Sequence, residues 1–228
     1  MFSELQSPTA VGAARVSHVA LADGQAPDRV VIADAELLLG GHFKKSGPDL
    51  IITGKDGQKV VISGYFSSGK LPDLVTAEGA GLPGHLVERL AVPNAPGQYA
   101  QVGAPAGGVV IGKVERLGGS ATVQHANGVV EELKIGDNVL QGDVVETRDG
   151  SLLAISFSDG TAFNMGANAR MVLNELIYEA GGSSNSAVFS LVKGTITFVA
   201  GQVAKTGNMR VDTPVATMGI RGTTVNTT

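Results

Sequence analysis

The sequence predicts an all-β protein: a sandwich or roll of short, mostly antiparallel strands, preceded by a smaller N-terminal region rich in β-hairpins. Composition supports this class, because 32 of the 228 residues are glycine, only 4% are aromatic and tryptophan is absent. Short apolar runs recur at intervals of about 8 to 12 residues, which is typical of sandwiches and barrels. Asn-Gly and Asp-Gly pairs between many of these runs predict tight turns.

Changes in composition divide the chain into four parts. Residues 1–28 form a leader with little predicted structure, and residues 29–92 form a small β-rich N-terminal domain. The stretch 93–108 is rich in Pro, Gly and Ala and carries almost no charge, which is typical of a linker. Residues 109–228 follow as a larger β domain, so we expect two folded units joined by a flexible connection.

Within the smaller domain, two β-branched runs flank the pair Asp56-Gly57 and predict a hairpin over residues 49–66. The apolar residues between 71 and 101 have mixed spacing, and a short helix over residues 85–91 fits that spacing. The hairpin is therefore the central predicted element of this domain.

The larger domain consists of regularly spaced extended runs. Leu153, Ile155 and Phe157 share one face of such a run, as a half-buried strand requires. The predicted strands cover residues 109–114, 121–125, 129–135, 139–145, 152–157, 161–165, 171–178, 187–192, 195–199 and 209–220.

The last of these runs contains a corner. Met209, Val211 and Thr213 alternate with polar residues, so a strand leads up to Pro214. Proline lacks the N–H that a central strand donates, so one strand ends there and another begins. Arg221 then lies between two glycines, which leave space for a close contact with the backbone.

Composition also bears on function. The net charge is -4 and no basic cluster occurs, so nucleic acid is not an expected partner. The absence of cysteine excludes disulfides and thiolate metal sites. No apolar window is long enough for a membrane span, and the N-terminus lacks the apolar run of a cleaved secretory signal. We therefore predict no cofactor, no metal and no membrane span.

Two glycine-rich segments resemble nucleotide-binding motifs but lack essential parts. Residues 64–70 fit a phosphate-binding loop up to the lysine, but Leu71 replaces the Ser or Thr that binds magnesium. Residues 79–84 match a dinucleotide fingerprint in spacing, yet Pro83 interrupts the turn and no acidic residue follows at the required interval of about 20 residues. An enzyme acting on a nucleotide is the least supported of the functions considered, and we expect no catalytic residues.

The histidines are scattered singly, without the spacing or acidic neighbours of a metal site, and we expect surface or strand-edge positions for them. They are His18, His42, His85 and His125. The Asp-Gly pairs are likewise better explained as turns than as calcium ligands.

Four blocks in the C-terminal half carry a family resemblance: a doubled Gly-Asp before a strand, an Asp-Gly hairpin, a Leu-x-x-Gly strand and a Thr-Pro-x-Ala segment ending in Arg-Gly-Thr. In this order and spacing they resemble the FecR domain. The motif residues are Gly136, Asp137, Gly142, Asp143, Asp159, Gly160, Gly194, Thr213, Pro214, Gly219, Arg221, Gly222 and Thr223.

The resemblance implies a β-rich periplasmic or extracellular module, and two functions follow from it. One is the non-enzymatic head of a large repeat-bearing bacterial surface protein or adhesin, exported without a cleaved N-terminal signal; the hairpin at 49–66 resembles the start of such proteins. The other is a periplasmic sensor in iron-responsive signal transduction. In the proteins that give the FecR family its name, the signal crosses the inner membrane through a membrane-spanning helix. The sequence contains no apolar window long enough for such a helix. Either function implies protein–protein interaction, with an envelope partner or the rest of a longer chain.

Two roles are open for Arg221. Its guanidinium could form a buried ion pair with Asp143 or Asp159 and lock the last strand onto the sheet, which is the interpretation we favour. Alternatively it contacts an anion or a partner. We also expect the chain to be a head module of a longer protein, because residue 228 closely follows the predicted final strand.

Overall fold

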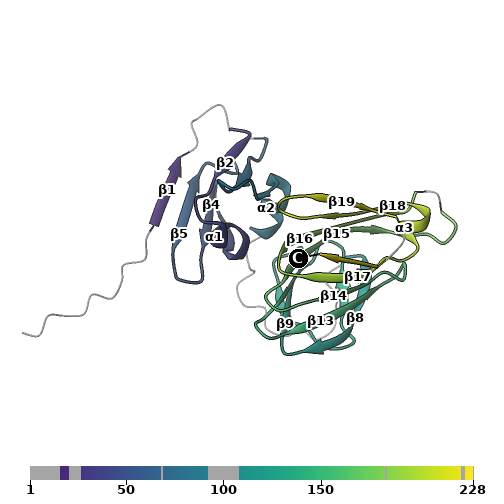
Figure 1. Ribbon diagram of the computed structural model, residues 1–228. Helices are drawn as coiled ribbons and strands as arrows, with labels where there is room; N and C mark the ends of the chain where they lie inside the picture. Colours follow the sequence, from purple (N-terminus) through teal and green to yellow (C-terminus); the bar gives the residue numbers. More distant parts are fainter. Residues whose placement is uncertain are drawn as a thin grey trace, which may run out of the picture.

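The computed structural model describes residues 16–20, 27–67, 69–91, 108–182, 184–221 and 224–227. Strands account for 49% of the structure and helices for 9%, so the predicted all-β class is confirmed. Figure 1 shows a smaller N-terminal unit packed beside a larger C-terminal unit. The predicted leader and linker lie mostly outside the described residues, and the four-part division of the chain stays a prediction.

The N-terminal unit contains a four-stranded sheet in the order β1-β5-β4-β3. Its strands are β1 Val16–Ala20, β3 His42–Ser46, β4 Asp49–Thr53 and β5 Lys59–Ser63. β4 and β5 are antiparallel, as the predicted hairpin requires, and β1 adds to β5 in parallel. The turn uses Gly57 at a φ of 81°, and Asp56 accepts a hydrogen bond from the backbone N–H of Gln58.

A three-stranded sheet and two short helices complete this unit. The strands are β2 Arg29–Val31, β6 Asp73–Val75 and β7 Gly81–Leu82, and the helices are α1 Ala35–Gly40 and α2 Gly84–Leu90. Asp34 caps α1 by accepting a hydrogen bond from the N–H of Leu37 at 3.1 Å, and the helix buries Leu37 and Leu38. α2 confirms the short helix expected over residues 85–91.

The C-terminal unit is a sandwich of two sheets (Figure 1). The seven-stranded sheet has the order β10-β9-β12-β15-β16-β18-β19, and the six-stranded sheet has the order β11-β8-β13-β14-β17-β20. The first comprises β9 Ala121–Gln124, β10 Val130–Glu132, β12 Val144–Thr147, β15 Arg170–Ile177, β16 Ser186–Lys193, β18 Asn208–Asp212 and β19 Thr217–Ile220. The second comprises β8 Val110–Gly118, β11 Asn138–Leu140, β13 Leu152–Phe157, β14 Ala162–Met165, β17 Ile196–Val199 and β20 Thr224–Thr227.

Aromatic side chains from both sheets meet in the sandwich core. Phe163 of β14 contacts Phe157 and Phe198 in its own sheet and Phe189 in the other, with ring centroids 4.8 to 5.5 Å apart. Leu153 and Ile155 point into the same core, as the alternation along β13 predicts. The buried face of β13 and of β14 thus follows the period of two that the sequence carries.

One predicted strand, residues 139–145, is two strands in different sheets. β11 ends at Leu140 and β12 begins at Val144, and the chain crosses from the six-stranded to the seven-stranded sheet between them. Gly142 has a φ of 83°, a conformation that ends a strand.

The predicted corner at Pro214 is confirmed: β18 and β19 form an antiparallel pair on either side of it. β18 itself lies parallel to β16, reached through β17 and the short helix α3 Val203–Thr206.

The N-terminal unit packs on the outer face of the seven-stranded sheet. Val144, Val172 and Val192 point away from the sandwich core and belong to the same apolar cluster as Leu38, Ile52 and Leu90 of the N-terminal unit. The neighbouring residues Val145, Met171 and Leu191 point into the sandwich. β15 and β16 are therefore buried on both faces, which explains their nearly continuous apolar sequence.

Candidate functional site

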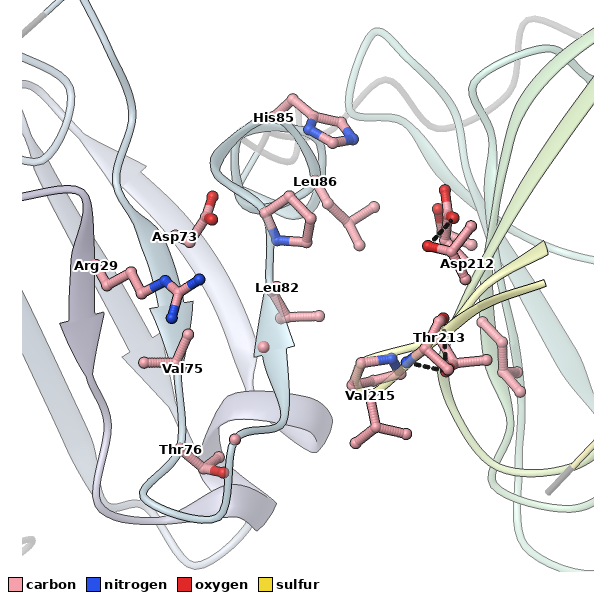
Figure 2. Close-up of a pocket in the computed structure, with 18 of the residues that line it drawn as sticks. Arg29, Asp73, Val75, Thr76, Leu82, His85, Leu86, Asp212, Thr213 and Val215 are labelled. Atoms are coloured by element: carbon pink, nitrogen blue, oxygen red, sulfur yellow. Dashed lines mark hydrogen bonds between the residues drawn. The ribbon is translucent and has the colours of Figure 1, made fainter. Parts of the chain in front are cut away.

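A cleft lies between the two units, beside the Thr-Pro corner of the family motif (Figure 2). It has a volume of about 590 Å³. One wall comes from β6, β7 and the start of α2, and the other from β16 and the turn that joins β18 to β19. The corner predicted from sequence is thus part of a surface shared by both units.

The turn at the corner is held by its own threonine. The hydroxyl of Thr213 donates to the carbonyl of Ala216 and accepts from the N–H of the same residue, each at 3.0 Å. The N–H of Thr213 adds a third bond to that carbonyl at 2.7 Å. Thr217 donates to Asp212 at 2.8 Å and ties the strand ends together. A rigid four-residue turn results, and it holds Val215 out towards solvent with 76% of its surface exposed.

The turn also contacts the N-terminal unit directly. The N–H of Gly81 in β7 donates to the carbonyl of Pro214 at 2.7 Å. Figure 2 shows Leu82 and Leu86 on one side of the cleft, facing Thr213 and Val215 on the other. This backbone bond positions the two walls relative to each other, with apolar side chains between them.

Charged groups line the cleft together with these apolar side chains. Arg29 and Asp73 line the N-terminal wall, and Arg210 lies 3.1 Å from Asp212 on the other wall. Asp73 accepts a hydrogen bond from the N–H of Gly84 and so supports the start of α2. A lining that mixes apolar side chains with charged groups of both signs is compatible with binding a protein segment.

Two of the three motif aspartates, Asp143 and Asp159, are buried and serve the fold. Asp143 accepts a hydrogen bond from the N–H of Leu140 at 2.7 Å and lies 2.8 Å from Nδ1 of His125. This hydrogen bond to Asp143 raises the pKa of His125, while burial acts against it. Asp159 accepts bonds from the N–H and hydroxyl of Thr161, and from the N–H of Val203 at the start of α3.

The motif glycines occupy turn conformations. Gly136, Gly142, Gly160 and Gly194 have φ values between 83° and 95°, which favour glycine. Gly194 is also crowded, because a Cβ there would lie 2.6 Å from Cβ of Ala169. Asp137 accepts a hydrogen bond from the N–H of Lys134 at 2.8 Å. These positions shape turns. Of the motif positions that the structure describes, only Thr213 and Pro214 line the cleft.

The family comparison matches the same part of the chain. Residues 143–228 match the family described as FecR protein. The chain carries a FecR domain. The matched region begins at Asp143, whereas the sandwich also contains β8 to β11 before it. A FecR domain fits a surface or signalling module at the cell envelope.

A solved structure titled "Cell surface anchoring domain" is 38% identical to the chain over the aligned part. The alignment covers 28% of this chain and 83% of that one, with a TM-score of 0.27. The comparison with curated proteins found no match. Among the residues that the structure describes, no helix has the length and apolar character needed to cross a membrane.

Arg221 of the FecR domain does not form the predicted lock. Its side chain is exposed beside α3, and no carboxylate of the described residues lies within salt-bridge distance of it. Asp143 and Asp159, its expected partners, instead bind backbone N–H groups, a histidine and a threonine. Gly219 lies in β19, and Gly222 and Thr223 lie outside the described residues.

The buried arginine of the FecR domain is Arg170, which the sequence did not single out. The residue is 6% exposed, and Nη1 donates to the carbonyl of Gly41 in the N-terminal unit at 2.9 Å. Nε lies 3.8 Å from Glu146, too far for a hydrogen bond. The sequence feature that could have identified Arg170 is a charged residue at the start of a nearly continuous apolar strand.

The remaining predicted motifs form ordinary structure. Residues 64–67 form a turn after β5, and residues 81–82 of the dinucleotide-like segment form strand β7. Among the described residues, no group of three or more His, Cys, Asp or Glu side chains is arranged to hold a metal ion. His18, His42 and His85 are exposed, and His125 is partly buried.

Proposed function

We propose that this chain is a non-enzymatic interaction module of a bacterial surface or secreted protein, of the kind found in the head region of adhesins. The cleft between the two units is its binding surface, and its partner is an envelope protein or another part of a longer chain. The observation that carries this proposal is the exposed Val215, held by a hydrogen-bonded turn beside a cleft of mixed polar and apolar lining.

Two further features support a binding role without catalysis. The motif aspartates Asp143 and Asp159 are buried and occupied by hydrogen bonds to the fold, so they are not available to a substrate. The turn that presents Val215 is held by three hydrogen bonds between Thr213 and Ala216, which limits the entropy lost on binding.

Photocrosslinking in the producing bacterium tests the binding surface. A photoreactive amino acid replaces Val215, and a control chain carries it at Leu152, which is 64% exposed on the other sheet. We expect covalent adducts with an envelope protein, or with a distant part of a longer chain, from position 215 and not from position 152. Equal labelling from both positions, or none from 215, would contradict the proposal.

Protease treatment of intact cells tests the location. A surface protein is digested without opening the outer membrane, whereas a periplasmic one is digested only after the membrane is made permeable. We expect digestion in intact cells, with a known periplasmic protein remaining whole as the control. Protection in intact cells would favour the second candidate.

The second candidate is a periplasmic FecR-type sensor in iron-responsive signalling, and the family match of residues 143–228 supports it. In that case deletion of the gene would abolish an iron-dependent transcriptional response, and an iron-siderophore complex would change the melting temperature of the purified chain. If neither the transcriptional response nor the melting temperature changes, the sensor function is contradicted and the surface module is favoured. Calcium, titrated in the same melting assay, serves as a comparison ligand.

A further inference from the structure

A second pocket, distinct from the cleft at Val215, lies where β3 of the N-terminal unit meets β9, β12 and β15 of the sandwich. Its volume is about 360 Å³. The charged and ionisable residues that line it are His42, Lys44, Glu146, Arg148 and Arg170. No family motif position that the structure describes lies in this lining, so the FecR resemblance assigns no role to this pocket.

The wall of the pocket includes a buried guanidinium with an unsatisfied donor. Arg170 is 6% exposed, and its Nη1 is taken by the carbonyl of Gly41. Nε has no hydrogen-bond partner, because the nearest carboxylate oxygen, on Glu146, is 3.8 Å away. Burial lowers the pKa of Arg170, and Glu146 only partly offsets this. A buried charged donor without an acceptor is costly, and an acceptor placed in the pocket would relieve that cost.

Two more cations stand at the mouth of the pocket. Lys44 and Arg148 are exposed, and neither forms an ion pair with a carboxylate of the described residues. Glu146 is the one carboxylate in the described lining. Three cations and one anion leave a formal charge of about +2 in this pocket, although the whole chain carries -4. The local charge therefore differs in sign from that of the molecule.

We propose that this pocket binds a small tetrahedral oxyanion, phosphate or sulfate. One oxygen accepts the hydrogen bond that Nε of Arg170 lacks, and Lys44 and Arg148 neutralise the charge from the open side. A dianion matches the formal charge of the lining, and arginine offers the planar donors that oxyanions favour. The bound anion would link β3 to the sandwich sheet, because its ligands come from both units.

Isothermal titration calorimetry with phosphate and with sulfate, each against sodium chloride at equal ionic strength, tests the site on the full chain. We expect saturable one-to-one binding of at least one of the two oxyanions and none of chloride. The oxyanion with the lower Kd identifies the better ligand. Absence of saturable binding for both, or equal heats with chloride, overturns the proposal.

Three charge variants separate this site from general electrostatics. Lys44→Gln removes a cation at the mouth of the pocket, and we expect it to weaken oxyanion binding about fivefold. Glu146→Gln removes the carboxylate that repels the anion, and we expect oxyanion binding about fivefold tighter. Lys113→Gln, at an exposed position of β8 outside the pocket, is the matched control and should leave Kd unchanged. Equal weakening by Lys44→Gln and Lys113→Gln, or weaker binding in Glu146→Gln, contradicts the proposal.

Discussion

At the level of single residues, the contact between His125 and Asp143 makes stability depend on pH. The hydrogen bond to Asp143 raises the pKa of His125 in the folded state above its unfolded value of about 6.5. Protonated His125 thus stabilises the fold below about pH 6.5, and the contribution is lost as the pH rises through the folded pKa. Glu131, 4.0 Å from Nε2, acts in the same direction.

Urea unfolding at about pH 5.5 and about pH 8.5 tests this contribution. We expect His125→Gln to lose about 1 kcal/mol more stability at the acidic pH than at the alkaline pH, relative to the original chain. His85→Gln, which removes an exposed histidine of α2, controls for the loss of a histidine elsewhere. A stability deficit in His125→Gln that is the same at both pH values would show that the pair does not titrate as argued.

The two arginines show how far single residues could be predicted from the sequence. Flanking glycines drew attention to Arg221, yet its side chain is exposed. Arg170 is buried because its neighbour in space, Gly41, comes from a segment 129 positions away in the chain. Local pattern predicts whether a strand face is buried, but it carries no information about which distant carbonyl will meet a charged side chain.

At the level of elements, turns joining the strands depend on glycine for two separable reasons. Gly194 has a φ of 94°, and an added Cβ would also lie 2.6 Å from Cβ of Ala169. Gly150 has a φ of 63° and nothing within 4 Å of an added Cβ. The first position combines backbone strain with crowding, and the second has strain alone.

Alanine at these two positions measures the difference. We expect Gly150→Ala to destabilise the fold by about 1 kcal/mol and Gly194→Ala by about 3 kcal/mol, because Ala169 in the turn before β15 must also move. The measurement is the free energy of unfolding in urea. Similar losses for the two variants would mean that crowding at Gly194 is relieved without cost.

Most elements were predictable where a turn residue separates two alternating runs. The β4–β5 hairpin and the β18–β19 corner follow this rule, with Gly57 and Pro214 as the separators. Residues 139–145 were predicted as one strand, although Gln141, Gly142 and Asp143 separate its two apolar pairs. The carboxylate of Asp143 accepts a hydrogen bond from the N–H of Leu140 and closes the turn at Gly142. Hydrophobic periodicity does not report such a bond.

At the level of the whole molecule, the outer face of the seven-stranded sheet holds the two units together. Val144, Val172 and Val192 supply the apolar contacts, and the bonds of Arg170 to Gly41 and of Gly81 to Pro214 add polar links. The sequence predicted two units but not the contact between them. Both faces of β15 are apolar, so no alternation of apolar and polar residues indicates which face meets the N-terminal unit.

Hydrogen exchange measured by mass spectrometry tests this docking. Val172→Ala should cost about 2 kcal/mol and should increase exchange mainly in α1, β3 and β4 of the N-terminal unit. Leu173 points into the sandwich core instead. In Leu173→Ala, the increase in hydrogen exchange should therefore appear mainly in the C-terminal strands. The same exchange pattern in both variants would show that the outer face does not separate the two cores.

The shared apolar cluster has a consequence for the order in which the chain folds. Ribosomes make the N-terminal unit first, but part of its core is supplied by Val172 and Val192, which emerge much later. Contacts of such high sequence separation form slowly, because a long loop must close before they contribute. We therefore expect the N-terminal unit, although it is synthesised first, to complete its folding last, once the sandwich is available as its support.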